Sequence, residues 1–134
     1  MKKELLLVLL LFLILIKNFV MANQLDSIKV QDAFKMQSEQ KAVIVDVREL
    51  VELKEGMIKM ALPIPISLME EKKEEWQKKV SILSKDTPII VYCRSGRRAE
   101  KVGAELLSKG YKVLNMGGFE SWKDAGLPVE IPSK

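Results

Sequence analysis

Two short runs of β-branched and aromatic residues constrain the fold of this chain more than any other feature. Residues 42–47 are Ala-Val-Ile-Val-Asp-Val, and residues 89–92 are Ile-Ile-Val-Tyr. Near-continuous apolar runs of this kind are typical of strands buried on both faces, as in a parallel sheet. Residues 97–109 follow the second run and carry apolar side chains at helical spacing. Alternating strands and helices predict an α/β fold with a mainly parallel central sheet, flanked by helices on both faces.

The other segments continue this alternation. Residues 28–38 have one apolar helical side, with Ser27 as a candidate N-cap. Residues 49–55 predict a short helix that Gly56 closes in the left-handed conformation. Ser67-Leu68-Met69-Glu70 matches a capping box, which predicts that a helix begins there and continues to Leu83. The remaining expectations are an edge strand or extended segment at 63–66, a strand at 112–114, and a final helix from 117–118 to Trp122.

The first 22 residues have the pattern of a secretory signal peptide. Lys2 and Lys3 precede an unbroken apolar run from Leu5 to Ile16, and Val20-Met21-Ala22 offers a cleavage site. The run is shorter than the roughly 20 residues that span a bilayer. We therefore expect a cleaved signal and a periplasmic or exported protein without stable membrane insertion. An uncleaved N-terminal anchor is the alternative.

Composition excludes several kinds of site. The chain has one cysteine and no histidine, which rules out a Cys-His hydrolase and a His-containing zinc site. A lone cysteine also cannot form a disulfide within the chain, and we expect no metal and no cofactor. Removal of residues 1–22 takes away three lysines and one glutamate, so the net charge falls from +4 to +2. Such a nearly balanced charge does not favour nucleic acid as a partner.

The single cysteine, Cys93, lies where the strand at 89–92 ends and the helix at 97–109 begins. Ligands of α/β sheets bind beyond the carboxyl ends of the strands. Ser95 and Gly96 allow a sharp turn that directs backbone N–H groups inward. Successive N–H groups at the start of a helix bind anions. The sequence therefore predicts that a small oxyanion binds next to the sulfur.

Three arginines follow the cysteine within five residues. Nearby cations favour the thiolate, which is the nucleophilic form of cysteine. We expect Cys93 to be a catalytic nucleophile and the rest of the loop to bind the anionic substrate. The predicted anion-binding residues are Arg94, Ser95, Gly96, Arg97 and Arg98.

Three segments in order resemble the rhodaneses, the thiosulfate sulfurtransferases. Residues 90–99, Ile-Val-Tyr-Cys-Arg-Ser-Gly-Arg-Arg-Ala, are similar to the active-site loop of that family. Residues 44–48 with Glu52 resemble its early Asp-Val-Arg segment and downstream glutamate. Its closing Gly-Gly…Trp…Ala-Gly-x-Pro-Val pattern is matched by residues 116–119, Trp122 and residues 125–129. The resemblance implies a single rhodanese domain over 23–134, with a three-layer fold.

The resemblance also implies a two-step reaction. The Cys93 thiolate takes the sulfane sulfur from thiosulfate or a similar donor, and the resulting persulfide passes it to cyanide or a thiol. The partners are thus a small sulfur-containing anion and a thiol or cyanide acceptor, and we expect a monomer. Asp46 and Arg48 are interpreted as a structural ion pair, and Phe119 and Trp122 as core residues.

The chain departs from the family pattern where the family has Gly-His-Ile and then Gly-Ala. Here the residues are Gly56-Met57-Ile58 and Met60-Ala61, which leaves the local geometry and a possible partner surface open.

Two other functions remain as alternatives. A cysteine phosphatase or arsenate reductase places five residues between cysteine and arginine, whereas residue 99 here is alanine and Arg98 closes a loop of six residues. A non-catalytic binding module in the cell envelope is the second alternative, which the intact arginine loop disfavours.

Overall fold

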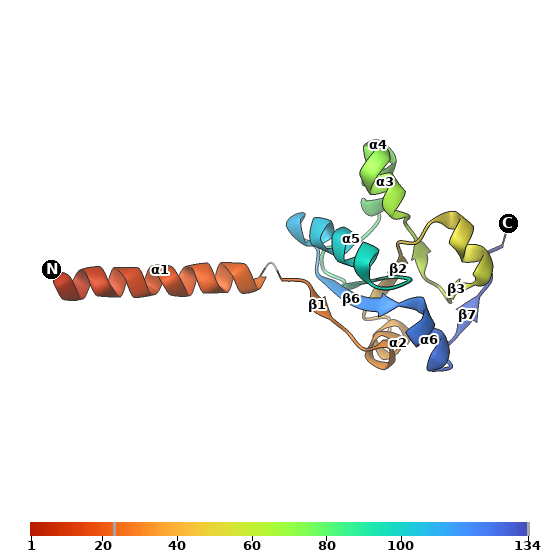
Figure 1. The fold of residues 1–134 in the computed structure, drawn as a ribbon, viewed down its shortest axis with the longest axis horizontal. Helices are drawn as coiled ribbons and strands as arrows, with labels where there is room; N and C mark the ends of the chain where they lie inside the picture. Colours follow the sequence, from red (N-terminus) through yellow and green to blue (C-terminus); the bar gives the residue numbers. More distant parts are fainter. Residues whose placement is uncertain (23, 134) are drawn as a thin grey trace.

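A parallel sheet forms the centre of the protein in the computed structural model, which describes residues 1–22 and 24–133 (Figure 1). Its five strands lie in the order β1-β6-β5-β2-β4, and every neighbouring pair is parallel. Their bounds are Asp26–Ser27 for β1, Val43–Asp46 for β2, Leu62–Pro63 for β4, Ile89–Cys93 for β5 and Val113–Gly118 for β6. The predicted α/β fold with a mainly parallel sheet is confirmed.

Side chains of the sheet point alternately to two hydrophobic cores. Ile89, Val91 and Cys93 of β5 belong to the first core, whereas Ile90 and Tyr92 belong to the second. This two-sided burial is the reason that the strand is apolar at every position. The helices of the first core are α3 (Ile66–Glu71), α4 (Lys73–Val80) and α5 (Arg97–Ser108). Those of the second are α2 (Val30–Ser38), the 3-10 helix η1 (Leu50–Glu55) and α6 (Phe119–Asp124).

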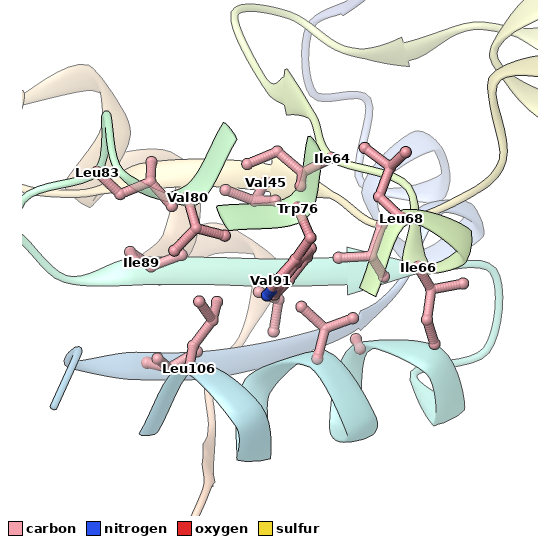
Figure 2. Packing of buried hydrophobic residues seen from close by; sticks show 14 of the residues in the cluster. Val45, Ile64, Ile66, Leu68, Trp76, Val80, Leu83, Ile89, Val91 and Leu106 are labelled. Carbon is pink, nitrogen blue, oxygen red and sulfur yellow. The ribbon is translucent and has the colours of Figure 1, made fainter. Parts of the chain in front are cut away.

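The aromatic residues expected in the interior are buried there. Trp76 of α4 packs among aliphatic side chains of the first core, next to Val91 of β5 (Figure 2). Trp122 and Phe119 lie in the second core. These three rings thus hold the helical layers on the sheet, and the interpretation of Phe119 and Trp122 as core residues is confirmed.

Several predicted helix boundaries were wrong, because tertiary contacts take up the residues expected to cap them. Ser67 does not cap a helix: α3 begins at Ile66 after Pro65, and the Ser67 hydroxyl donates to Glu49 at 2.7 Å. The segment expected to form one helix breaks at Lys72 into α3 and α4. Ser27 does not cap α2 either, since it is the last residue of β1 and pairs with β6.

The segment from 113 to 118 is a longer strand than predicted. Residues 117–118 were expected to begin a helix, but they end β6 and α6 starts at Phe119. The register with β5 passes from Val91 opposite Asn115 to Tyr92 opposite Gly117, so Met116 is an extra residue in a β-bulge. Gly117 adopts a φ of 91°, which glycine accepts without a steric cost.

Part of the segment that departs from the rhodanese pattern belongs to a second, two-stranded sheet. The antiparallel strands β3 (Met57–Ile58) and β7 (Val129–Glu130) form it. Met57 is buried in the second core, so it acts there as an apolar core residue. Gly56 closes η1 with a φ of 106° and a ψ of 162°, which is a positive φ but not the expected left-handed helical conformation.

Helix α1 (Lys2–Ala22) precedes the domain (Figure 1). Its span from Lys2 to Met21 is long and apolar enough to cross a membrane, and none of that span is buried inside the protein. A helix near the N-terminus with these properties is compatible with a signal peptide or with an anchor. The apolar helix is therefore longer than the 12-residue run suggested.

Candidate active site

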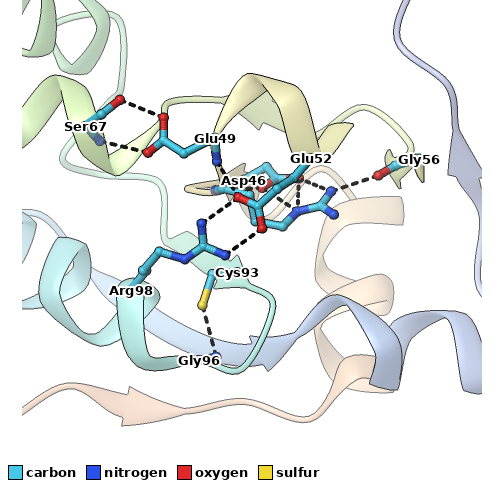
Figure 3. A network of polar contacts seen from close by, with 9 residues as sticks. Asp46, Glu49, Glu52, Gly56, Ser67, Cys93, Gly96 and Arg98 are labelled. Atoms are coloured by element: carbon cyan, nitrogen blue, oxygen red, sulfur yellow. Dashed lines mark hydrogen bonds and ion pairs between the residues drawn. The ribbon is translucent and has the colours of Figure 1, made fainter. Parts of the chain in front are cut away.

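Cys93 is the last residue of β5, the middle strand of the sheet, and the loop to α5 begins after it. Its side chain is fully buried, and its Sγ accepts a hydrogen bond from the Gly96 N–H at 3.0 Å (Figure 3). Gly96 adopts the left-handed conformation, with a φ of 93°, at the N-cap of α5. A side chain at this position would be strained, so glycine allows the chain to turn and direct its N–H at the sulfur. The sulfur thus lies beneath a helix N-terminus with one backbone donor in contact.

The Arg98 side chain lies above the sulfur and is held by a carboxylate (Figure 3). Its two terminal nitrogens donate to the two oxygens of Glu52 at 2.6 and 2.8 Å. This hydrogen bonding lowers the pKa of Glu52 to about 2. Glu52 in turn raises the pKa of Arg98, with a smaller contribution from Cys93. Both partners are about a quarter exposed, so the pair borders the solvent.

The helix η1 that carries Glu52 is itself fixed by a capping box. Glu49 is its N-cap, and the Glu49 N–H donates to the Glu52 carboxylate at 2.8 Å. The Glu49 carboxylate accepts from the backbone N–H and the hydroxyl of Ser67 at the start of α3. These contacts connect α3, η1 and Arg98, and they set the position of the guanidinium over Cys93.

A buried polar network lies beside the candidate site, at the end of β2. Arg48 donates two hydrogen bonds to the Asp46 carboxylate and one to the Gly56 carbonyl at 2.8 Å. Tyr92 donates its hydroxyl proton to Asp46 and accepts the N–H of Ile58. Burial, followed by the charge of Asp46, raises the pKa of Tyr92. The structural ion pair predicted for Asp46 and Arg48 is therefore present.

An open cleft of ≈ 520 Å³ lies next to the cysteine loop. Arg94 and Ser95 line it from the loop, and Glu52 lines it from η1. The other lining residues are Arg48, Glu55, Phe119, Glu120 and Lys123. Hollows of ≈ 450 and ≈ 490 Å³ lie elsewhere on the domain, so size does not single out this cleft. Its position beside the buried thiol does.

The predicted site residues fall into two groups. Gly96 and Arg98 lie close to the sulfur of Cys93, whereas Arg94 and Ser95 are exposed at the cleft. Arg97 is exposed at the first position of α5. The loop thus provides contacts to the sulfur on its inner side and positive charge on its outer side.

The part of β6 that supports this loop was not predicted from the sequence. A Cβ added to Gly118 would lie 2.4 Å from the Arg94 carbonyl oxygen, so the loop rests directly on this strand. Asn115 donates a hydrogen bond to the Gly96 carbonyl at 3.1 Å. The pair Gly117-Gly118 was a signal of close backbone approach, but nothing in the local sequence marks Asn115.

Two curated relatives with similar sequences are named sulfurtransferases. The chain is 33% identical over 114 residues to a sulfurtransferase of Allochromatium vinosum, covering 84% of this chain and 98% of that protein. It is 30% identical over 94 residues to the thiosulfate sulfurtransferase GlpE of Coxiella burnetii, covering 69% of this chain and 81% of the relative.

Solved structures share the fold. A rhodanese-related protein of Thermoplasma volcanium matches with a TM-score of 0.66 and 30% identity, covering 80% of this chain and 99% of that one. A rhodanese-like domain protein of Staphylococcus aureus matches with a TM-score of 0.66 and 28% identity, covering 81% and 100%. The family model described as rhodanese-like domain matches residues 29–125. The chain therefore belongs to the rhodanese-like domain family and has the fold of that family.

Proposed function

We propose that this protein is a sulfurtransferase in which Cys93 carries the transferred sulfur as a persulfide. The Cys93 thiolate attacks the outer sulfur of a donor such as thiosulfate. The sulfur–sulfur bond of the donor breaks, and its electron pair leaves with sulfite. A thiolate or cyanide then attacks the outer sulfur of the persulfide and releases the Cys93 thiolate. The two half-reactions form a ping-pong cycle that begins and ends with the same enzyme form.

The observation that carries this proposal is the contact between the Gly96 N–H and the Cys93 Sγ at 3.0 Å. A fixed backbone donor stabilises negative charge without reorganising during the reaction. Because Gly96 is also the N-cap of α5, the helix adds positive potential at the same point. The thiolate is thereby supported without a general base, which fits a chain without histidine.

The arginines have separate tasks in this proposal. Arg94 is exposed at the cleft together with Ser95, where both meet the oxyanion end of an incoming donor. Arg98 lies above the sulfur and stabilises the charge that develops there. Arg97 adds positive potential at the first turn of α5. Planar guanidinium groups suit this task because they present paired donors to oxyanions.

The test is an intact-mass measurement on the full chain, purified in detergent micelles. Incubation with thiosulfate and removal of excess reagent should leave an added mass of about 32 Da, one sulfur atom on cysteine. Cyanide should remove this mass and yield thiocyanate. The matched control is Cys93→Ser, which should show no addition. Absence of the added mass in the reduced wild-type protein would contradict the proposal.

Two alternatives predict different results. A cysteine phosphatase or arsenate reductase would hydrolyse an aryl phosphate, or reduce arsenate, faster than it transfers sulfur to cyanide. The loop of six residues from Cys93 to Arg98 is one residue shorter than the Cys-x5-Arg loop and disfavours this function. A binding module without catalysis would keep its biological role in Cys93→Ala, whereas a sulfurtransferase would lose it.

We further propose that residues 23–134 form the single rhodanese domain and that residues 1–22 export it. Mass spectrometry of the protein isolated from its native cells tests this. An N-terminus at Asn23 in a soluble envelope fraction would support a cleaved signal. An intact N-terminus in the membrane fraction would instead support an anchor, with the domain as a monomer at the membrane surface.

A further inference from the structure

Asn115 lies on β6 and uses both ends of its amide to join two parts of the candidate site. Its Nδ2 donates to the Gly96 carbonyl at 3.1 Å and to the Glu100 carboxylate at 3.1 Å. Its Oδ1 accepts the Gly117 N–H at 2.9 Å. A planar amide has two donors and an acceptor in fixed directions, so few side chains could make this set of contacts.

The acceptor end of Asn115 stabilises the β-bulge. The bond from the Gly117 N–H back to a side chain two residues earlier closes a local turn around Met116, the extra residue of β6. The bulge brings Gly117 and Gly118 opposite Tyr92 and Cys93. A strand without it would shift by one residue and would present different residues to the loop.

The donor end holds the residue that contacts the sulfur. Gly96 donates its N–H to the Cys93 Sγ at 3.0 Å, and its carbonyl accepts from Asn115 and from the Glu100 N–H. The carbonyl is therefore held from two sides, by α5 and by β6. Glycine has the widest range of φ and ψ, so hydrogen bonds that hold the Gly96 carbonyl reduce the conformations open to this residue, including those that turn its N–H away from the sulfur.

We infer that Asn115 is a positioning residue for sulfur transfer: it holds Gly96 so that the Gly96 N–H stays directed at Cys93. The inference rests on the proposed function of Cys93, and it adds a residue outside the cysteine loop. Close packing supports it, because a Cβ on Gly96 would lie 3.1 Å from the Gly117 Cα, and one on Gly118 would lie 2.4 Å from the Arg94 carbonyl oxygen. Small movements of β6 are thus transmitted to the loop.

Two substitutions separate the roles of the amide. Asn115→Asp keeps an acceptor for the Gly117 N–H but removes the donor to Gly96, whereas Asn115→Ala removes both. Glu100→Gln is the matched control, because it neutralises the other partner of Asn115 and leaves the bond to Gly96 in place. Each variant is made in the full chain, and its melting temperature is measured to confirm that it folds.

The first measurement is the single-turnover rate of persulfide formation at increasing thiosulfate concentration. We expect the maximal rate to fall about tenfold in both Asn115 variants, the equivalent of one ordinary hydrogen bond. The thiosulfate concentration at half-maximal rate should stay within about twofold, because Arg94 and Ser95 still bind the donor. Glu100→Gln should keep the wild-type rate. Wild-type rates in Asn115→Asp and Asn115→Ala would overturn the inference.

The second measurement does not depend on sulfur transfer. In ¹H–¹⁵N spectra the amide proton of Gly96 should move upfield in both Asn115 variants, since its bond to the sulfur lengthens, and should keep its position in Glu100→Gln. An unchanged Gly96 resonance in the Asn115 variants would overturn the positioning role. If the wild-type protein formed no persulfide, the proposed function would fail, and this spectrum would still decide the role of Asn115.

Discussion

The domain contains two arginine–carboxylate pairs next to the ends of neighbouring parallel strands, and they differ in burial. Asp46 and Arg48 follow β2 and are 0% and 3% exposed. Glu52 and Arg98 meet beside the end of β5 and are 26% and 29% exposed. The first pair also satisfies Tyr92 and the Gly56 carbonyl, and the Arg48 guanidinium packs 4.3 Å from the centre of the Phe119 ring. In the second pair Glu52 lines the cleft, and Arg98 lies close to the sulfur.

This difference separates structural charge from charge that can serve a substrate. A buried charge needs all of its partners, so Asp46 and Arg48 have nothing left to offer an incoming anion. A partly exposed pair gains little net stability in water and can exchange partners at low cost. In the proposed function Arg98, and not Arg48, is therefore the arginine that serves an anionic donor. Three experiments test this contrast.

The largest effect should come from Asp46→Asn. The substitution leaves the Arg48 charge buried without a counter-charge, and we expect a loss of about 3–5 kcal/mol in the free energy of unfolding. Urea unfolding measures this. The matched control is Lys41→Ala, which breaks the surface pair with Glu39 and should cost less than about 1 kcal/mol. If Asp46→Asn cost no more than this control, the distinction between the pairs would be wrong.

Arg98→Ala should have an intermediate effect, and mainly on the reaction. We expect kcat/KM for thiosulfate:cyanide transfer to fall by about tenfold to a hundredfold, the range for a charge-assisted hydrogen bond. The free energy of unfolding should change by less than about 1 kcal/mol. Lys101→Ala is the control, because it removes an exposed cation from the same helix at a distance from the sulfur. An equal loss of activity in both variants would point to overall charge and not to Arg98.

The smallest effect should be a dependence of stability on acid pH. Hydrogen bonding from Arg98 lowers the pKa of Glu52 from 4.5 to about 2. A carboxylate whose pKa is lowered by folding stabilises the fold at any pH above its pKa in the unfolded state. This contribution is lost as the pH falls from 4.5 towards 2. The melting temperatures of the wild type and Glu52→Gln should thus differ most near neutral pH and converge below pH 4.5. A constant difference over this range would show that Glu52 does not act through its charge.

Local patterns predicted β2, β5 and the helix after Cys93 but misplaced the helix caps. Residues 67–70 match a capping box in sequence, whereas the capping box in the structure joins Glu49 and Glu52. Both segments have suitable side chains three residues apart. The choice between them depends on Ser67, whose hydroxyl is already engaged by Glu49 from another element. A cap is a local hydrogen bond, and a tertiary contact can replace it.

The candidate site was predictable as far as it lies within one stretch of chain. Strand, cysteine, glycine turn and helix follow one another in residues 89–109, so spacing alone places the sulfur at a helix N-terminus. The roles of Glu52 and Asn115 were not predictable in this way. They lie 41 residues before and 22 residues after Cys93 and reach the loop only because η1 and β6 pack against it.

The sequence by itself thus determined the α/β class, the buried strands, the place of Cys93 between a strand and a helix, and the absence of histidine chemistry. These follow from residue type and local periodicity, which act over a few residues. The tertiary structure alone decided which arginine is buried against a carboxylate, which lies partly exposed near the sulfur, and what holds Gly96 in contact with the sulfur. Such features depend on burial and on hydrogen bonds between distant elements, and both exist only after the sheet and its two cores have formed.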